Sequence, residues 1–190
     1  MQWRNTADRY DLIGRALHWL VAIGIVAQYL LAEAAQEDKA GAAEPLGAAS
    51  IHMALGVAIL ALATLRMAWR LLELAPERPA AMKSYEIAIA RVAHVAFYVL
   101  LFAIPLSGWA LATVSDQGLS FLGWFNLPQF SPLNLRKDQL EEVHEVLFNL
   151  LVALAVLHVA AALKHQLIDR DGVLRSMLPW WPRPRAQKIR

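Results

Sequence analysis

Four stretches of the chain contain no Asp, Glu, Lys or Arg and consist mainly of apolar residues. They are 17, 21, 24 and 18 residues long and cover residues 16–32, 45–65, 92–115 and 146–163. A helix that crosses a membrane needs about 20 mostly apolar residues, so each stretch is long enough once its flanks are included. The pattern therefore predicts four transmembrane helices near residues 12–32, 48–70, 88–113 and 141–164.

The composition supports this prediction. The chain has 190 residues, of which 58% are hydrophobic, and a mean hydropathy of +0.39, which excludes an ordinary soluble domain. No internal repeat is evident, so we expect one all-α domain over residues 1–190, an integral membrane four-helix bundle. The segment 116–139 is apolar and aromatic but is broken by Gly118, Gly123 and Pro128. We expect it to lie at the outer membrane interface.

The charges are distributed unevenly between the two ends of the predicted bundle. One side carries the N-terminus, the connection between the second and third helices, and the C-terminus. It holds 15 of the 18 Lys and Arg and 7 of the 16 acids, a net charge of 15 − 7 = +8, and the other side has 3 − 9 = −6. The positive-inside rule therefore places both termini in the cytoplasm. A cleaved signal peptide is the alternative for the first segment, but Asp8, Asp11 and His18 interrupt its pattern.

Two histidines in the last apolar stretch carry the strongest functional signal. His144 and His158 are fourteen residues apart, so both side chains leave the same face of a helix, separated by roughly 21 Å along its axis. An ionisable side chain inside a membrane helix is costly and is by default a hypothesis of function. Two of them on one face predict two stacked sites.

The predicted topology sorts four histidines by depth. His52 and His144 lie near the outer side, and His18 and His158 lie about two turns from the inner side, each pair on two different helices. Facing imidazoles in a helix bundle are suited to bind a haem from both sides. His94 has a depth similar to that of the inner pair, and spacing alone allows it to replace either inner ligand or to contact a haem edge or a quinone.

Other metal chemistry is less suited to the sequence. The absence of cysteine excludes iron–sulfur clusters and thioether-linked haem. Zinc needs three or four ligands at one depth, and the outer level has only two histidines, with Glu141, Glu142 and Glu145 nearby.

Further candidates lie at the inner boundary. His165 follows His158 by seven residues and is either a surface histidine or a proton donor and hydrogen-bond partner beside the inner site. Haem propionates there would need cationic partners, and the arginines at this boundary are Arg15, Arg66, Arg70 and Arg91. We expect only one or two of them to have this role, with Arg15 and Arg70 as the candidates. Positive-inside anchoring already explains most of the basic residues at this boundary.

The chain resembles the bacterial cytochrome b561 family, within the wider group that includes the b-type subunits of hydrogenases and formate dehydrogenases. The resemblance covers nearly the whole chain and rests on short motifs in a fixed order. These are Arg9-Tyr10, Arg15-Ala16-Leu17-His18-Trp19, Ile51-His52-Met53-Ala54-Leu55-Gly56, Ala93-His94, Pro105-Leu106-Ser107-Gly108-Trp109, His144-Glu145, His158 and His165.

The resemblance implies two non-covalent b haems, with axial pairs His52/His144 and His18/His158. It also implies a multi-pass protein of the bacterial inner membrane and a quinone, such as ubiquinone, near the inner haem, with His165 as the candidate contact. The expected function is electron transfer between a periplasmic donor and the quinone pool. Some members of the family look like superoxide:ubiquinone oxidoreductases, so whether the chain is an enzyme stays open.

Superoxide and other partners remain alternatives. An outer charge of −6 should repel an anion, although Arg136 and Lys137 could form a local positive entry. The chain could instead be the anchor subunit of a larger dehydrogenase or hydrogenase, or a non-redox membrane structural or transport protein. We expect membrane lipid, a quinone and an unidentified periplasmic donor as partners, and no nucleic acid; a homodimer is compatible with this class.

Overall fold

The computed structural model describes residues 10–37, 47–73, 82–115, 120–130 and 135–178 of the chain. Its long helices are α1 (Leu12–Glu37), α2 (Ala48–Leu72), α3 (Ser84–Val114) and α4 (Lys137–Lys164). The short elements are β1 (Ser120–Phe121), β2 (Phe125–Asn126), the π-helix η2 (His165–Asp169) and α5 (Val173–Met177). All four long helices have the length and apolar composition needed to cross a membrane. The predicted all-α membrane bundle is confirmed, with a β-hairpin of two two-residue strands added.

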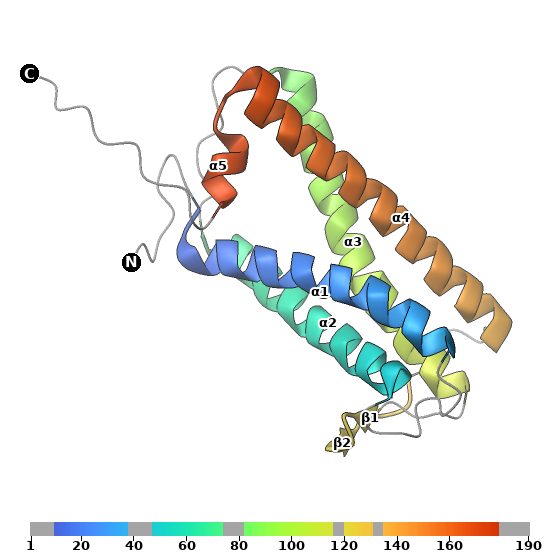
Figure 1. Cartoon of the computed structure of the whole chain (residues 1–190). Helices are drawn as coiled ribbons and strands as arrows, with labels where there is room; N and C mark the ends of the chain where they lie inside the picture. The colour runs from blue at the N-terminus through green and yellow to red at the C-terminus, as the bar shows by residue number, and fades with distance from the viewer. Residues whose placement is uncertain (1–9, 38–46, 74–81, 116–119, 131–134, 179–190) are drawn as a thin grey trace, which may run out of the picture.

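The four long helices form two pairs. α1 packs along α2, α3 packs along α4, and contacts between α2 and α3 join the two pairs (Figure 1). The most closely packed apolar cluster contains Val21 of α1, Ile59 and Ala63 of α2, and Leu101 of α3. Gly24 permits this close packing, because a Cβ atom at that position would lie 3.1 Å from Cγ1 of Ile59. Many other large apolar side chains are exposed, as expected where helices face lipid.

The helices are longer than the charge-free stretches. α1 continues to Glu37, α3 begins at Ser84 instead of residue 88, and α4 begins at Lys137 instead of residue 141. In the first turns of α3 and α4, a side chain accepts a hydrogen bond from the free backbone N–H group at the start of the helix. Glu86 accepts from the Lys83 N–H at 3.0 Å, and Gln139 accepts from the Arg136 N–H at 3.0 Å. Charged and polar residues that ended the apolar pattern therefore belong to the helices.

The hairpin of β1 and β2 lies in the segment 116–139, which was predicted to lie at the outer membrane interface. Its strand β1 contacts α2, and the residues that follow the hairpin are attached to the last turns of α3. Trp109 Nε1 donates to the Pro128 carbonyl at 3.0 Å, and the Phe130 N–H donates to Thr113 Oγ1 at 3.1 Å. Strands of two residues are too short to produce a recognisable alternation, so the sequence did not predict them.

The two ends of the described chain meet at the opposite end of the bundle. Arg15 Nη1 donates to the Leu178 carbonyl at 3.2 Å, and Trp19 Nε1 donates to the Met177 carbonyl at 2.9 Å. These bonds attach α5 to the first turns of α1, and neither α5 nor this contact was predicted. The start of α1 and the segment after α4 therefore lie at one end, as an even number of spans requires.

Replacing Gly24 by leucine tests the close approach of α1 and α2. The new side chain would overlap Ile59, so we expect a loss of about 1–3 kcal/mol of stability and a lower thermal unfolding midpoint in detergent. Ile23→Leu is the matched control, because the neighbouring Ile23 is exposed and can change shape freely. An unchanged midpoint in Gly24→Leu would contradict this packing.

Candidate functional site

The structure brings four histidines together as two pairs between the helix pairs. The ring centroids of His52 on α2 and His144 on α4 are 6.4 Å apart, with 71° between the ring planes. The centroids of His18 on α1 and His158 on α4 are also 6.4 Å apart, with 68° between the planes. Each pair thus links the α1–α2 pair to α4, at two different levels of the bundle.

A third imidazole lies at the level of His158. The ring of His94 on α3 is 6.1 Å from the His158 ring, and Phe97 contacts the same ring at 5.3 Å. His158 therefore has two histidine neighbours at similar distances, on α1 and on α3. The sequence allowed either His18 or His94 as the partner of His158, and the two ring distances are too similar to favour one of them.

His144 is held in place by two residues of α3. Its Nδ1 atom is 2.9 Å from Ser107 Oγ, and Ser107 Oγ also donates to the Ile104 carbonyl at 2.8 Å. A Cβ atom on Gly108 would lie 3.1 Å from His144 Cε1, so a side chain at this position would push the ring away from α3 by a few tenths of an ångström. Sequence reasoning gave these two residues no role, because their contact with His144 joins positions far apart in the chain.

The level of His52 and His144 also contains two buried polar atoms that need a partner. Within the described part of the chain, His52 Nδ1 and Gln28 Oε1 have no hydrogen-bond partner. Gln28 approaches α2 at Gly56, where a Cβ atom would be 3.3 Å from Gln28 Nε2. Buried polar groups are normally paired, so these atoms indicate a site adapted to a further group.

Arginines and an aspartate form a polar cluster at the end of the bundle near α5. Asp11 is fully buried and accepts hydrogen bonds from the Gly14 N–H at 2.8 Å and from Trp69 Nε1 at 3.1 Å. The buried Arg15 donates to the carbonyls of Asp11 and Leu178. These bonds bring the start of α1 and the end of α2 together in one polar region.

Two further arginines of this region differ in their surroundings. Arg66 donates to the Gly14 carbonyl at 3.0 Å, and its charge acts on both His18 and His158. Arg70 is exposed and lines a small pocket together with Arg66. Arg66 is therefore the arginine that combines partial burial with an electrostatic effect on both histidines of the inner pair.

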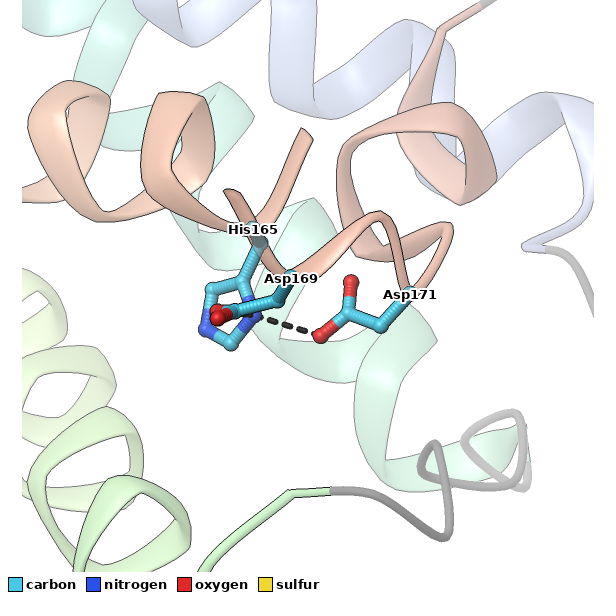
Figure 2. A group of neighbouring side chains, drawn as sticks. All are labelled: His165, Asp169 and Asp171. Carbon is cyan, nitrogen blue, oxygen red and sulfur yellow. Dashed lines mark hydrogen bonds and ion pairs between the residues drawn. The ribbon is translucent and has the colours of Figure 1, made fainter. Parts of the chain in front are cut away.

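His165 begins the π-helix η2 and faces two carboxylates (Figure 2). Its Nδ1 atom is 2.5 Å from Asp171 Oδ2 and 3.2 Å from Asp169 Oδ2. Asp171 is itself fixed, because its other oxygen accepts from the Val173 N–H at 3.1 Å. Short π-helices are often found at functional sites, and all of these contacts use Nδ1, which leaves Nε2 for another partner.

The same three side chains could be considered as metal ligands. Their nearest ligand atoms all lie within 4.8 Å of one another. However, Lys164 Nζ is 2.7 Å from Asp169 Oδ2 and 2.7 Å from Glu86 Oε1. The Lys164 ammonium group already supplies positive charge to this cluster, which makes it an ion-paired network around His165.

Membrane-spanning helices that face one another through pairs of histidines are the arrangement expected of a b-type membrane cytochrome. Residues 9–180 match the sequence profile of the family described as prokaryotic cytochrome b561. The chain belongs to this family. It is therefore a multi-pass bacterial membrane protein that binds b-type haem and transfers electrons.

Curated relatives match over most of their length. The chain is 31% identical over 179 residues to cytochrome b561 homolog 2 of Escherichia coli (strain K12), covering 94% of this chain and 95% of the relative. It is 26% identical over 172 residues to cytochrome b561 homolog 1 of the same organism, covering 90% and 98%. It is also 26% identical over 173 residues to the probable superoxide oxidase CybB of Yersinia pestis, covering 90% and 96%.

Proposed function

We propose that the chain holds two b haems, one between His52 and His144 and one between His18 and His158. The observation that carries this proposal is the presence of two histidine pairs, at two levels, each with a ring separation of 6.4 Å. A metal–nitrogen bond of about 2 Å on each side of an iron, plus the two ring radii, separates the ring centres by about 6 Å. Both pairs fit this requirement.

Further features of the described residues support the outer site. Gly108 leaves room for the His144 ring, and His52 Nδ1 and Gln28 Oε1 are buried polar atoms in need of partners. A haem iron with two axial imidazoles supplies one-electron transfer and has no open position for a substrate. The protein's own task is to orient the imidazoles and to exclude water from the bundle.

Arg66 is our candidate for a haem propionate contact at the inner site. Its guanidinium is partly buried and its charge acts on His18 and His158, whereas Arg70 is exposed. A charge-assisted hydrogen bond between a guanidinium and a carboxylate suits this position. Arg15 and Arg70 remain candidates for the same role on the basis of the sequence.

A quinone site beside the inner haem is proposed at His165. The two carboxylates hold Nδ1 of this ring, so Nε2 can donate a hydrogen bond or a proton to a quinone oxygen. Reduction of a quinone to a quinol consumes two electrons and two protons. His165 with Asp171 offers a route for protons at the end of the bundle that contains α5.

The charge distribution supports a particular orientation of the protein in the membrane. We propose that the end with α5 and the arginine cluster faces the cytoplasm, in the bacterial inner membrane, and that the end with the hairpin faces the periplasm. Electrons would enter at the His52/His144 level and leave at the His18/His158 level. His144 and His158 are separated by roughly 21 Å along the axis of α4. This separation leaves a gap of order 10 Å between the edges of the two proposed haems.

The periplasmic donor is a separate question. Superoxide is favoured by the name of the Yersinia pestis relative, but the charge of the proposed outer face opposes it. Arg136 and Lys137 do not offset this, because Arg136 pairs with Asp138 at 2.6 Å and Lys137 pairs with Glu141 at 3.5 Å. A neutral or cationic donor suits this end better.

Haem content tests the two-site proposal. The purified wild-type protein should contain two haems per chain by pyridine haemochrome assay, and His144→Ala and His52→Ala should each retain one. His165→Ala is the control and should retain both, because His165 faces Asp171 and not another histidine. A wild-type value near one haem per chain would exclude the two-site proposal, and the absence of a Soret band would exclude haem binding.

Alanine variants of His18 and His94 decide the inner pair. We expect His18→Ala to lose the inner haem and His94→Ala to keep it, with the same haemochrome assay and the low-spin spectrum as readouts. His94 and His18 lie at similar distances from His158, so they are matched in position. The reverse outcome would assign His94 as the axial ligand.

Reoxidation by quinone tests the role of His165. With dithionite-reduced protein in detergent, a ubiquinone analogue should oxidise the haems in the wild type, and His165→Ala should slow this on the order of 10²-fold, as expected for loss of a proton donor. Leu167→Ala, a change of an exposed η2 residue, is the control. Equal rates in His165→Ala and wild type would place the quinone elsewhere.

Stopped-flow reduction by superoxide tests the donor. If superoxide reaches the outer end against net negative charge, its reaction rate should rise with ionic strength, because salt screens the repulsion. A rate that falls with ionic strength would instead indicate attraction of the anion to a positive entry.

A further inference from the structure

We propose that Ser107 is a positioning residue for His144, which keeps the proton of this imidazole on Nδ1 and lowers the reduction potential of the outer haem. This inference rests on the proposed haem site between His52 and His144. It concerns a hydroxyl group that lies outside the set of ligands, on a different helix from either histidine.

The direction of the hydrogen bonds follows from the single proton of the hydroxyl group. Ser107 Oγ lies 2.8 Å from the Ile104 carbonyl, which can only accept, so the hydroxyl proton points there. Ser107 Oγ is then the acceptor in its 2.9 Å contact with His144 Nδ1. The Nδ1 atom must therefore carry the imidazole proton, and the lone pair of a neutral His144 ring lies on Nε2.

The position of the ring is fixed by the same turn of α3. Gly108 follows Ser107 and leaves the space that His144 Cε1 occupies, 3.1 Å from where a Cβ would be. The bond to Ser107 and the contact with Gly108 hold two sides of the imidazole. Nε2, the second nitrogen of the ring, is then left for an iron between His144 and His52, whose rings are 6.4 Å apart.

The electronic consequence comes from the strength of this hydrogen bond. An imidazole that donates its Nδ1 proton to an acceptor becomes a more basic ligand through Nε2. A more basic axial ligand stabilises ferric over ferrous iron, which lowers the reduction potential. In this site the effect acts from the α4 side, through the contact of His144 Nδ1 with Ser107 Oγ.

The charges near the other site act in the opposite direction. The Arg66 guanidinium acts electrostatically on His18 and His158, and positive charge favours the reduced form of a nearby haem. Ser107 at one level and Arg66 at the other therefore both favour movement of an electron from the outer to the inner site.

Potentiometric titration of Ser107 variants tests the inference. In Ser107→Ala we expect the midpoint potential of the outer haem to shift upward while that of the inner haem stays at the wild-type value. The outer haem is identified as the one that His144→Ala lacks. Loss of the hydrogen bond should also weaken haem retention at this site on the order of 10-fold, the usual effect of removing a residue that supports a metal ligand.

Two further variants separate the hydroxyl group from general damage. Ser107→Thr keeps a hydroxyl and should restore both the potential and the haem content. Thr64→Ala is the matched control, since Thr64 Oγ1 also donates to a carbonyl of its own helix, at 2.8 Å, and its side chain is exposed. It should leave both potentials unchanged.

The possible outcomes are distinct. An outer potential that stays the same or falls in Ser107→Ala overturns the inference and leaves the two-haem proposal intact. If Ser107→Ala loses the outer haem, restoration of haem and potential in Ser107→Thr supports the inference, and equal loss in both variants overturns it. A wild-type protein without haem at the His52/His144 level would refute the proposed function itself.

Discussion

An imidazole placed inside an apolar bundle has to find a polar partner there, and the arrangement of this protein depends on that constraint. α1 pairs with α2 and α3 pairs with α4, and the closest apolar packing, around Ile59 and Ala63, lies where α1, α2 and α3 meet. His18 on α1 and His52 on α2 each face a histidine on α4. The polar groups therefore mark where the two pairs face each other, and a cofactor held by the imidazoles would contribute to the packing of the bundle as well as to its chemistry.

The two ends of the bundle differ in their polar contacts. The end that contains α5 collects Asp11, Arg66, and His165 with its carboxylates, and it is the end at which we propose the propionate and quinone contacts. The other end carries the hairpin, which exposes Trp124 and Phe125, and two ion pairs at the start of α4, in which Arg136 and Lys137 take part. Such an asymmetry gives a direction to an otherwise repetitive arrangement of two similar histidine pairs.

The number of helices and the grouping of histidines could be predicted from the sequence, because both depend on local counts. Apolar runs give spans of known rise per residue, and the distance of His18 or His158 from the end of a run gives its depth. The helix ends were missed because Glu86 and Gln139 lie outside the apolar runs that defined the spans. The contacts of Ser107 with His144 and of Arg15 with Leu178 could not be predicted, since each joins distant parts of the chain. The sequence did not decide between His94 and His18 as the partner of His158, and the 6.1 Å between the rings of His94 and His158 does not decide it either.

The attachment of α5 to α1 has a consequence for the order of assembly during synthesis. Arg15 and Trp19 bind carbonyls that are 163 and 158 residues further along the chain. α1 and α2 can pair as soon as both have entered the bilayer, and all four spans are complete at Lys164. The contacts with Met177 and Leu178 can form only after the ribosome has moved past them. Each newly made molecule therefore passes through a stage in which its four long helices have been synthesised but the contacts between α5 and α1 have not yet formed.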